Sequence, residues 1–235
     1  MILEKIINKL ILGVGIQTIV LLTTITAYSQ SEEFSDEDEA QVSFVDISID
    51  RVYPQNTFKD GLNKNLWGFS LAVLGQRKSK NVDYFGLKFD YAHLGSNTAN
   101  FALVDERTGS NHFSIQFLYR LYPNFYIGRI EPYFEASLGP QFFYTVTTLT
   151  FLDDNTSDVD FDEFDWGLSY GLSFGVSVHV YGQVFIYYKV GYFSGTSITY
   201  LIETENTSTI PIENFSPRTS QTNNVRMQFG VAVSF

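Results

Sequence analysis

The chain closes on the stretch Asn224-Val-Arg-Met-Gln-Phe-Gly-Val-Ala-Val-Ser-Phe235. Every second side chain from Val225 to Phe235 is apolar, and those between them are polar or small. Neighbouring side chains of a strand point to opposite faces. Such strict alternation therefore predicts a strand with one apolar and one polar face.

The same alternation recurs in seven earlier segments, and the chain is rich in Phe and Tyr, which favour strands. The segments are residues 42–52, 66–76, 82–93, 111–122, 131–148, 166–180 and 183–197. Their connections alternate between long and short, with long loops expected at 94–110, 149–165 and 198–222. Outer-membrane barrels have short turns on the periplasmic side and long loops outside. We therefore predict an all-β, eight-stranded, antiparallel up-and-down transmembrane β-barrel.

A soluble lipocalin-like barrel or a β-sandwich is the rival fold. It would need its large apolar residues inside. In the segment from Trp166 to Val180, however, the face opposite the large residues consists mainly of Gly and Ser, which are too small to fill a soluble core. The large residues are therefore expected to face lipid.

The first 29 residues are predicted to be a secretory signal peptide. Lys5 and Lys9 precede an apolar stretch from Leu10 to Leu22, and small residues follow at Ala27-Tyr28-Ser29. A transmembrane anchor is the alternative, but the apolar run is short and is broken by glycines. Residues 30–41 are acidic and are expected to stay disordered. The barrel is expected to occupy residues 42–235, in the outer membrane.

Composition excludes several function classes. The formal net charge of −11 argues against nucleic acid as a partner. The absence of cysteine excludes a disulfide framework and a thiolate metal site. Since no phosphate loop, zinc spacing or nucleotide fingerprint is found, no cofactor and no metal are expected.

The polar face predicts a plugged interior. If it points inward, it brings four cations and four anions into the barrel: Asp46, Asp50, Lys88, Asp90, Arg120, Glu135, Lys189 and Arg226. Side chains fill the interior of an eight-stranded barrel, and buried charges must be paired. We predict an internal salt-bridge network, with a gated polar path as the alternative.

Five outward aromatic side chains are expected to form a girdle at the extracellular rim, where amphipathic rings meet the lipid headgroups. They are Trp67, Tyr91, Tyr144, Trp166 and Tyr192.

Two further features are weighed as sites. The carboxylates of 149–165 cluster as in calcium sites, but the EF-hand spacing fails, and a solvated acidic loop is the favoured interpretation. His112 and Ser114 share a strand face and resemble, over two residues only, the His-x-Ser pair of lipid A deacylase barrels. Because His112 falls on the inward face and no orienting carboxylate is evident, catalysis is not expected.

The signal ending Ala27-Tyr-Ser-Gln30, the eight segments and the terminal Val-Ser-Phe235 resemble the outer-membrane β-barrel domain proteins of Bacteroidota-type bacteria. The architecture is similar to the OmpA and OmpX barrels. In such barrels the last strand looks like the signal that the barrel-assembly machinery recognises. The resemblance assigns that role here to Phe229, Val231, Val233 and Phe235.

The resemblance implies a non-catalytic envelope scaffold or surface adhesion protein. A narrow transport channel or a secretion-accessory barrel is the alternative, and a lipid A-modifying enzyme is a more distant one. Implied partners are outer-membrane lipid and lipopolysaccharide, the barrel-assembly machinery, and an extracellular ligand at loops 149–165 and 198–222. A monomer is expected.

Overall fold

The computed structural model describes residues 43–62, 64–76, 82–101, 104–123, 129–151, 153, 156–204, 208 and 210–235. The predicted signal peptide and acidic segment lie outside these residues. No helix in the described part of the chain is long and apolar enough to cross a membrane.

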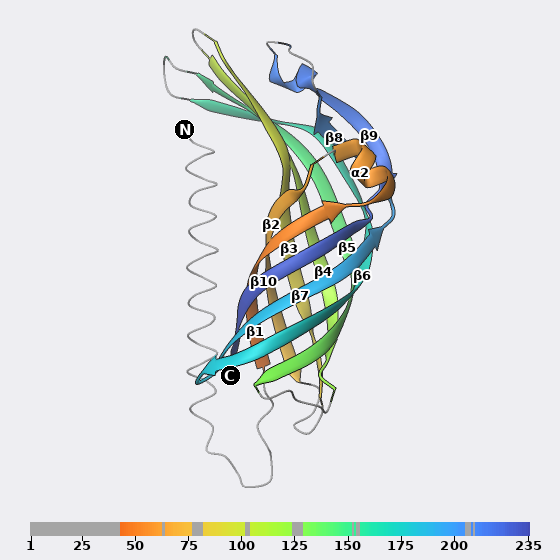
Figure 1. Cartoon of the computed structure of the whole chain (residues 1–235). Helices are drawn as coiled ribbons and strands as arrows, with labels where there is room; N and C mark the ends of the chain where they lie inside the picture. Colours follow the sequence, from red (N-terminus) through yellow and green to blue (C-terminus); the bar gives the residue numbers. More distant parts are fainter. Residues whose placement is uncertain are drawn as a thin grey trace.

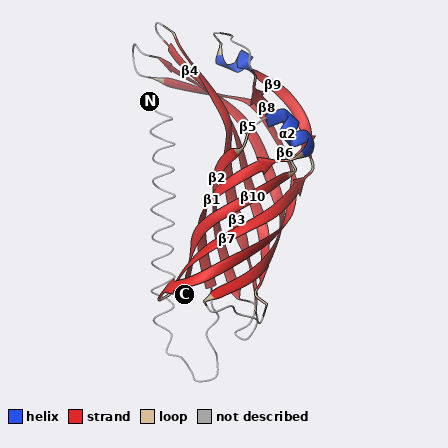
Figure 2. Cartoon of the chain, viewed as in Figure 1, coloured by secondary structure: helices blue, strands red, loops and turns tan. Residues whose placement is uncertain are grey.

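Eight strands form a closed antiparallel barrel, as the alternating segments predict (Figures 1 and 2). They are β1 (Ser43–Pro54), β2 (Leu66–Gln76), β3 (Asp83–Asn100), β4 (Val104–Leu121), β5 (Ile130–Phe151), β6 (Ser157–Tyr181), β7 (Val184–Gly195) and β10 (Asn224–Ser234). β10 joins the ring between β7 and β1. At the chain ends Ser43 and Phe235 exchange two backbone hydrogen bonds of 2.9 and 3.0 Å. Closure leaves this part of the sheet without an unpaired edge.

The outer wall of the barrel is apolar and its interior is polar. Large apolar side chains are exposed on every barrel strand; on β10 they are Met227, Phe229, Val231 and Val233. The side chains between them, such as Arg226 and Gln228, are buried inside. This distribution is the inverse of that in a soluble barrel, and it suits a barrel surrounded by lipid.

The strands are staggered around the ring. Paired residues lead from Gly68 through Ala92, His112 and Phe143 to Asp165 on β6. In the other direction they lead through Asp50, Gln228 and Lys189 to Gly175, ten residues further along the same strand (175 − 165). Because the strands tilt, residues that pair across the sheet do not lie at one height in the membrane.

The long connections expected from the sequence are largely strand. The β3–β4 hairpin fills most of 94–110, and the β5–β6 hairpin fills most of 149–165. The segment 198–222 holds β8 (Ser197–Glu203), the 3-10 helix η1 (Pro211–Asn214) and β9 (Phe215–Gln221), and β8 pairs with β9. The hairpins rise above the barrel. In 158–161 carboxylates still alternate with Val159 and Phe161, so the backbone pairing extends a two-residue pattern whose acidic composition suggested a loop.

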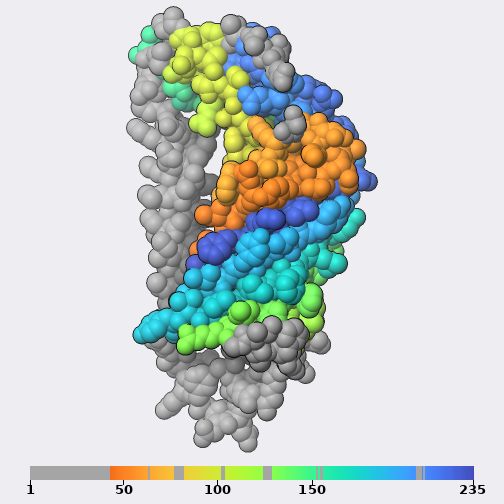
Figure 3. Space-filling model, in the orientation of Figure 1, coloured from red at the N-terminus to blue at the C-terminus, as the bar shows by residue number. Residues whose placement is uncertain are grey.

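A short helix, α2 (Asn56–Leu62), lies in the first connection. It begins two residues after Pro54, which ends β1 and cannot donate a backbone hydrogen bond, and its first residue Asn56 takes a positive φ of 53°. Figure 1 shows α2 beside the β8–β9 pair at the end where the hairpins project. In the space-filling view the orange α2 region lies directly against these blue segments (Figure 3).

Candidate functional site in the barrel interior

The barrel interior gathers all eight predicted charges. They stand on β1, β3, β4, β5, β7 and β10, and each is 3% exposed or less. Alternation along the strands places them there, because an inward residue is followed two positions later by another. They form two groups, named here the lower cluster (Asp46, Arg120, Glu135 and Lys189) and the upper cluster (Asp50, Lys88, Asp90 and Arg226).

The lower cluster joins four strands across the barrel. Arg120 lies between two carboxylates: its Nη2 is 2.5 Å from Asp46 Oδ2 and 2.7 Å from Glu135 Oε2. Arg120 Nε also donates to Glu135 Oε2 at 3.0 Å, and Lys189 Nζ donates to Glu135 Oε1 at 2.5 Å. Two cations thus face two anions, which offsets the cost of removing each from water.

The upper cluster is centred on Asp90. Its carboxylate lies 3.0 Å from Arg226 Nη1 and 3.3 Å from Lys88 Nζ, and it accepts hydrogen bonds from Ser70 (2.7 Å) and Ser114 (2.9 Å).

Asp50 belongs to this cluster through hydroxyl groups. Ser48 donates to it at 2.8 Å, and the Ser70 hydroxyl contacts it as well. Among the described residues no cation forms an ion pair with Asp50. Sequence reasoning, which treats all inward charges alike, therefore missed the separate environment of this carboxylate.

An apolar cluster, the floor, closes the barrel below the charges. It consists of Phe44, Ala72, Leu74, Tyr84, Leu118, Tyr133, Tyr187 and Ala232, with Tyr122 and Phe185 packed against it. The Tyr133 ring is 4.6 Å from Arg120 Cζ, so this aromatic group contacts the lower cluster directly. These residues share the inward face with the charges. The large side chains of Tyr84, Tyr133 and Tyr187 on that face were the feature of the sequence from which the floor could have been predicted.

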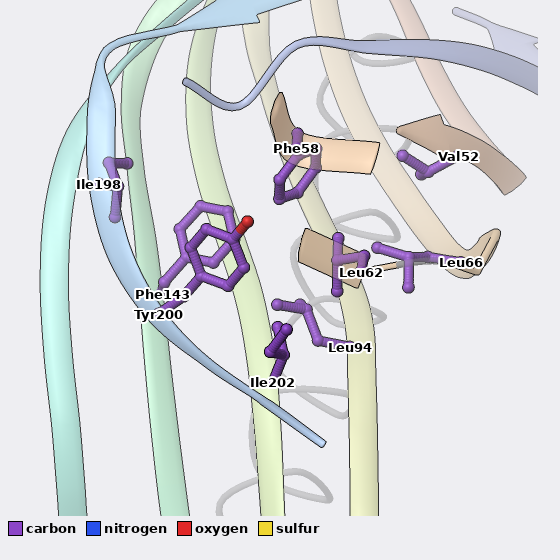
Figure 4. Close-up of a cluster of buried hydrophobic side chains, with 9 residues drawn as sticks. All are labelled: Val52, Phe58, Leu62, Leu66, Leu94, Phe143, Ile198, Tyr200 and Ile202. Carbon is purple, nitrogen blue, oxygen red and sulfur yellow. The ribbon is translucent and has the colours of Figure 1, made fainter. Parts of the chain in front are cut away.

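A second apolar cluster, the cap, closes the opposite end (Figure 4). Its residues come from α2, β8 and the barrel strands: Val52, Phe58, Leu62, Leu66, Leu94, Phe143, Ile198, Tyr200 and Ile202. The Phe58 ring lies 6.1 Å from that of Phe143 and 5.5 Å from that of Tyr200.

Tyr200 anchors the cap. Its hydroxyl is 2.9 Å from Ser220 Oγ, and burial raises the pKa of this phenol, which keeps it protonated. A Cβ on Gly61 would lie 2.6 Å from the Tyr200 hydroxyl, so only glycine lets α2 approach this closely. Sequence reasoning missed the cap. Its signals were the four-residue spacing of Phe58 and Leu62 and the short alternation Ile198, Tyr200, Ile202.

The two residues weighed for catalysis lie beneath the cap. The His112 ring packs 4.7 Å from that of Phe143, and Ser114 donates to Asp90. A cavity of about 10 Å³ next to His112 is also lined by Gln141, Asn224 and Arg226. Such a volume suits one water molecule rather than a substrate. Neither residue lies on the lipid-facing wall.

Asp153 precedes β6, and the other described carboxylates weighed as a calcium site lie on the inner side of upper β6. The Thr147 hydroxyl donates to Asp162 at 2.7 Å, and Asp165 accepts the backbone N–H of Thr199 at 2.7 Å. Within the described residues no group of three or more acidic or histidine side chains is arranged to hold a metal ion. Asp154 lies outside those residues.

The five aromatic residues expected in the girdle all point outward, but the stagger separates their heights. The residue of β6 at the height of Gly68 is halfway between Asp165 and Gly175, at Tyr170. Because of the stagger, paired residues on adjacent strands differ in height by about 1.25 residues. With this offset applied, Tyr91 and Tyr192 lie near the height of Gly68, as does Trp67. With the same offset applied, Trp166 and Tyr144 lie four to five residues higher than Gly68, which is roughly 10 Å of height. The five residues therefore share the outward face but not one height, because strand tilt cannot be read from alternation.

The sequence matches no protein-family model and no curated protein. Solved structures with a similar fold include Ail, the attachment invasion locus protein of Yersinia pestis, in complex with the heparin analogue sucrose octasulfate. It is 15% identical, the match covers 83% of this chain and 99% of Ail, and the TM-score is 0.45. Neisserial surface protein A is 15% identical over 83% of this chain and 97% of its own, with a TM-score of 0.41. A major outer membrane protein from Thermus thermophilus is 12% identical over 82% and 99%, with a TM-score of 0.43.

At these identities the likeness concerns the fold alone, and conclusions about this chain rest on its own strands and side chains. Its ring of eight antiparallel strands is closed, its outer wall is apolar and its interior is polar. By these features the chain is an eight-stranded transmembrane β-barrel of the outer-membrane type.

Proposed function

We propose that the protein is a non-catalytic, non-conducting barrel of the outer membrane that carries an interaction surface outside the cell. The observation that supports this best is closure at three levels. The floor, the two charge clusters and the cap follow one another along the barrel, and each is built from buried side chains. A solute would have to separate buried ion pairs as well as two apolar clusters.

The outer-membrane location is proposed from both chain ends and from the wall. The predicted signal peptide would direct export, and the apolar wall would meet lipid and lipopolysaccharide. The outward side chains Phe229 and Val233, with the terminal Phe235, are proposed to act in recognition by the assembly machinery. Phe235 closes the ring against Ser43, so recognition and closure would use the same strand.

The interaction surface is proposed to consist of the β3–β4 and β5–β6 hairpins with β8 and β9. Asp158, Asp160 and Asp162 are exposed on the β5–β6 hairpin. They favour a cationic over an anionic ligand. Ail was solved with a sulfated sugar analogue, but an anionic ligand of that kind does not suit this acidic surface.

Conductance of the full chain tests the closed interior. The protein is refolded into phosphatidylcholine vesicles, checked for a migration difference between boiled and unboiled samples, and fused with a planar bilayer. We expect a heat-modifiable barrel without steady unitary conductance. Large, steady unitary steps from a heat-modifiable sample would instead establish the competing function, a narrow channel.

Bead binding tests the interaction surface. Vesicles that hold the protein are mixed with polylysine-coated or dextran-sulfate-coated beads. We expect retention on polylysine only, and loss of it when residues 146–162 are replaced by a tight turn between the paired residues Thr145 and Glu163. Equal binding of the shortened variant would remove the assignment of this hairpin.

A further inference from the structure

The outer side of β6 carries an apolar column that is more than twice as long as that of β10. Exposed large apolar side chains extend from Val180 to Phe161, a span of 19 residues (180 − 161). On β10 the outward apolar residues run from Val233 to Val225, a span of eight residues (233 − 225). Eight residues of a tilted strand cover roughly 20 Å of height, close to the ~25 Å apolar band of outer-membrane barrels.

The upper part of this column rises above the level of Trp67, Tyr91 and Tyr192. Tyr170 is the β6 residue level with Gly68, next to Trp67. Phe161 lies nine residues above it, or eight after discounting the bulge residue opposite Thr145 and Val146. This corresponds to about 20 Å of height once the strand tilt is taken into account. Phe161 is nevertheless 73% exposed and Trp166 60% exposed.

At the height of Phe161 the outward residues of β4 and β5 are polar, although Val146 of β5, slightly lower, pairs directly with Phe161. With the height offset of about 1.25 residues per strand, the outward, exposed Arg107 of β4 lies level with Phe161. Its pairing partner on β5 is Thr148, which is also polar. The inner side of upper β6 is also polar, since Asp160, Asp162 and Asp165 point there. The strand therefore sorts aromatic groups to one side and carboxylates to the other, and the aromatic side lies without a covering group among the described residues.

The hairpins curve away from α2 and the β8–β9 pair in Figure 1. Outward curvature of this kind turns the outer side of β6 toward the membrane plane. We infer that Phe161, Phe164 and Trp166, named here the β6 ridge, dock on the lipid surface of the outer leaflet and form a membrane contact beyond the transmembrane band. The inference rests on the proposed outer-membrane function.

Continuity identifies lipid as the partner. Outward residues from the ridge down to Val180 include no charged side chain, so the ridge extends the lipid-facing wall without a polar break. Aromatic side chains suit the headgroup region, and the carboxylates on the other side of the strand stay in water. The ridge would make the barrel lean toward β6 or hold the β5–β6 hairpin down on the leaflet.

Tryptophan fluorescence tests the inference, because the chain has only two tryptophans: Trp166 lies in the β6 ridge and Trp67 in the lower wall of the barrel. Trp67→Phe leaves Trp166 in the ridge, and Trp166→Phe leaves Trp67 in the wall. In a background with both replaced, Phe161→Trp reports on the top of the ridge. Arg107→Trp is the matched control at the same height on β4. Each full-length variant is refolded in phosphatidylcholine vesicles with or without brominated acyl chains, and folding is verified by heat-modifiable migration.

We expect tryptophan at 161 and at 166 to show the same blue-shifted emission as Trp67 and the same degree of quenching by brominated lipid. Tryptophan at 107 should show the emission of a water-exposed residue. Unquenched, water-like emission at 161 and 166 with normal quenching of Trp67 would overturn the ridge contact and leave the barrel assignment intact. Blue but unquenched emission at 161, with a chemically cross-linked dimer, would overturn it in favour of a second copy. Loss of Trp67 quenching as well would point to failure of the membrane-barrel proposal itself.

Discussion

Replacing Arg120 with leucine tests how the barrel interior holds together. The change removes a side chain that contacts Asp46 at 2.5 Å and Glu135 at 2.7 and 3.0 Å, all inside the barrel. Lys189 stays with Glu135, but Asp46 then has no ion-pair partner among the described residues. An isolated buried carboxylate is costly, because nothing replaces the water that it has lost.

Breaking a buried ion pair by removing one partner costs about 3–5 kcal/mol, and we expect a loss of that size for Arg120→Leu. The double variant Arg120→Leu with Asp46→Asn removes the unpaired charge and should recover roughly half or more of the loss. Arg107→Leu, an exposed arginine on upper β4, is the control and should change stability by less than about 0.5 kcal/mol.

Urea unfolding of each variant in phosphatidylcholine vesicles, followed by tryptophan fluorescence and by gel migration, measures these differences. A loss below about 1 kcal/mol for Arg120→Leu would refute the buried network, because a hydrated lumen would screen the remaining carboxylates. A double variant no more stable than the single one would show that the cost lies in lost packing against Tyr133 rather than in unpaired charge.

Further predictions concern the cap, the turn and the chain end. Phe58→Ala should destabilise the protein by about 3–5 kcal/mol and increase proteolysis within α2, without adding conductance, because the charge clusters stay closed. Gly61→Ala should cost about 1–3 kcal/mol by pushing against Tyr200, measured by urea unfolding. Gly182, with φ of +56° in the tight β6–β7 turn, should tolerate Asn but lose roughly 1 kcal/mol on change to Ala. Deleting Phe235 removes two hydrogen bonds to Ser43 and should slow insertion into vesicles; unchanged folding kinetics would exclude a role in closure.

The wall of the barrel follows from residue order. Val225 to Phe235 alternate because a strand turns successive side chains to opposite faces, whatever the rest of the fold does. The closed ring of eight strands agrees with that pattern. The cap did not follow in the same way, because α2 and β8 are too short for their spacing to stand out, and their partners Phe143 and Leu94 are distant in sequence.

By itself the sequence determined which side chains face lipid and which face the interior, because that choice depends only on the two-residue period of a strand. It therefore identified the eight charges of the two clusters and the outward direction of the five aromatic residues. Only the tertiary structure decided that Arg120 lies between Asp46 and Glu135, that hydroxyl groups surround Asp50, and that Trp166 stands above Trp67. These relations depend on strand tilt and on the ten-residue stagger around the ring, which no local pattern records.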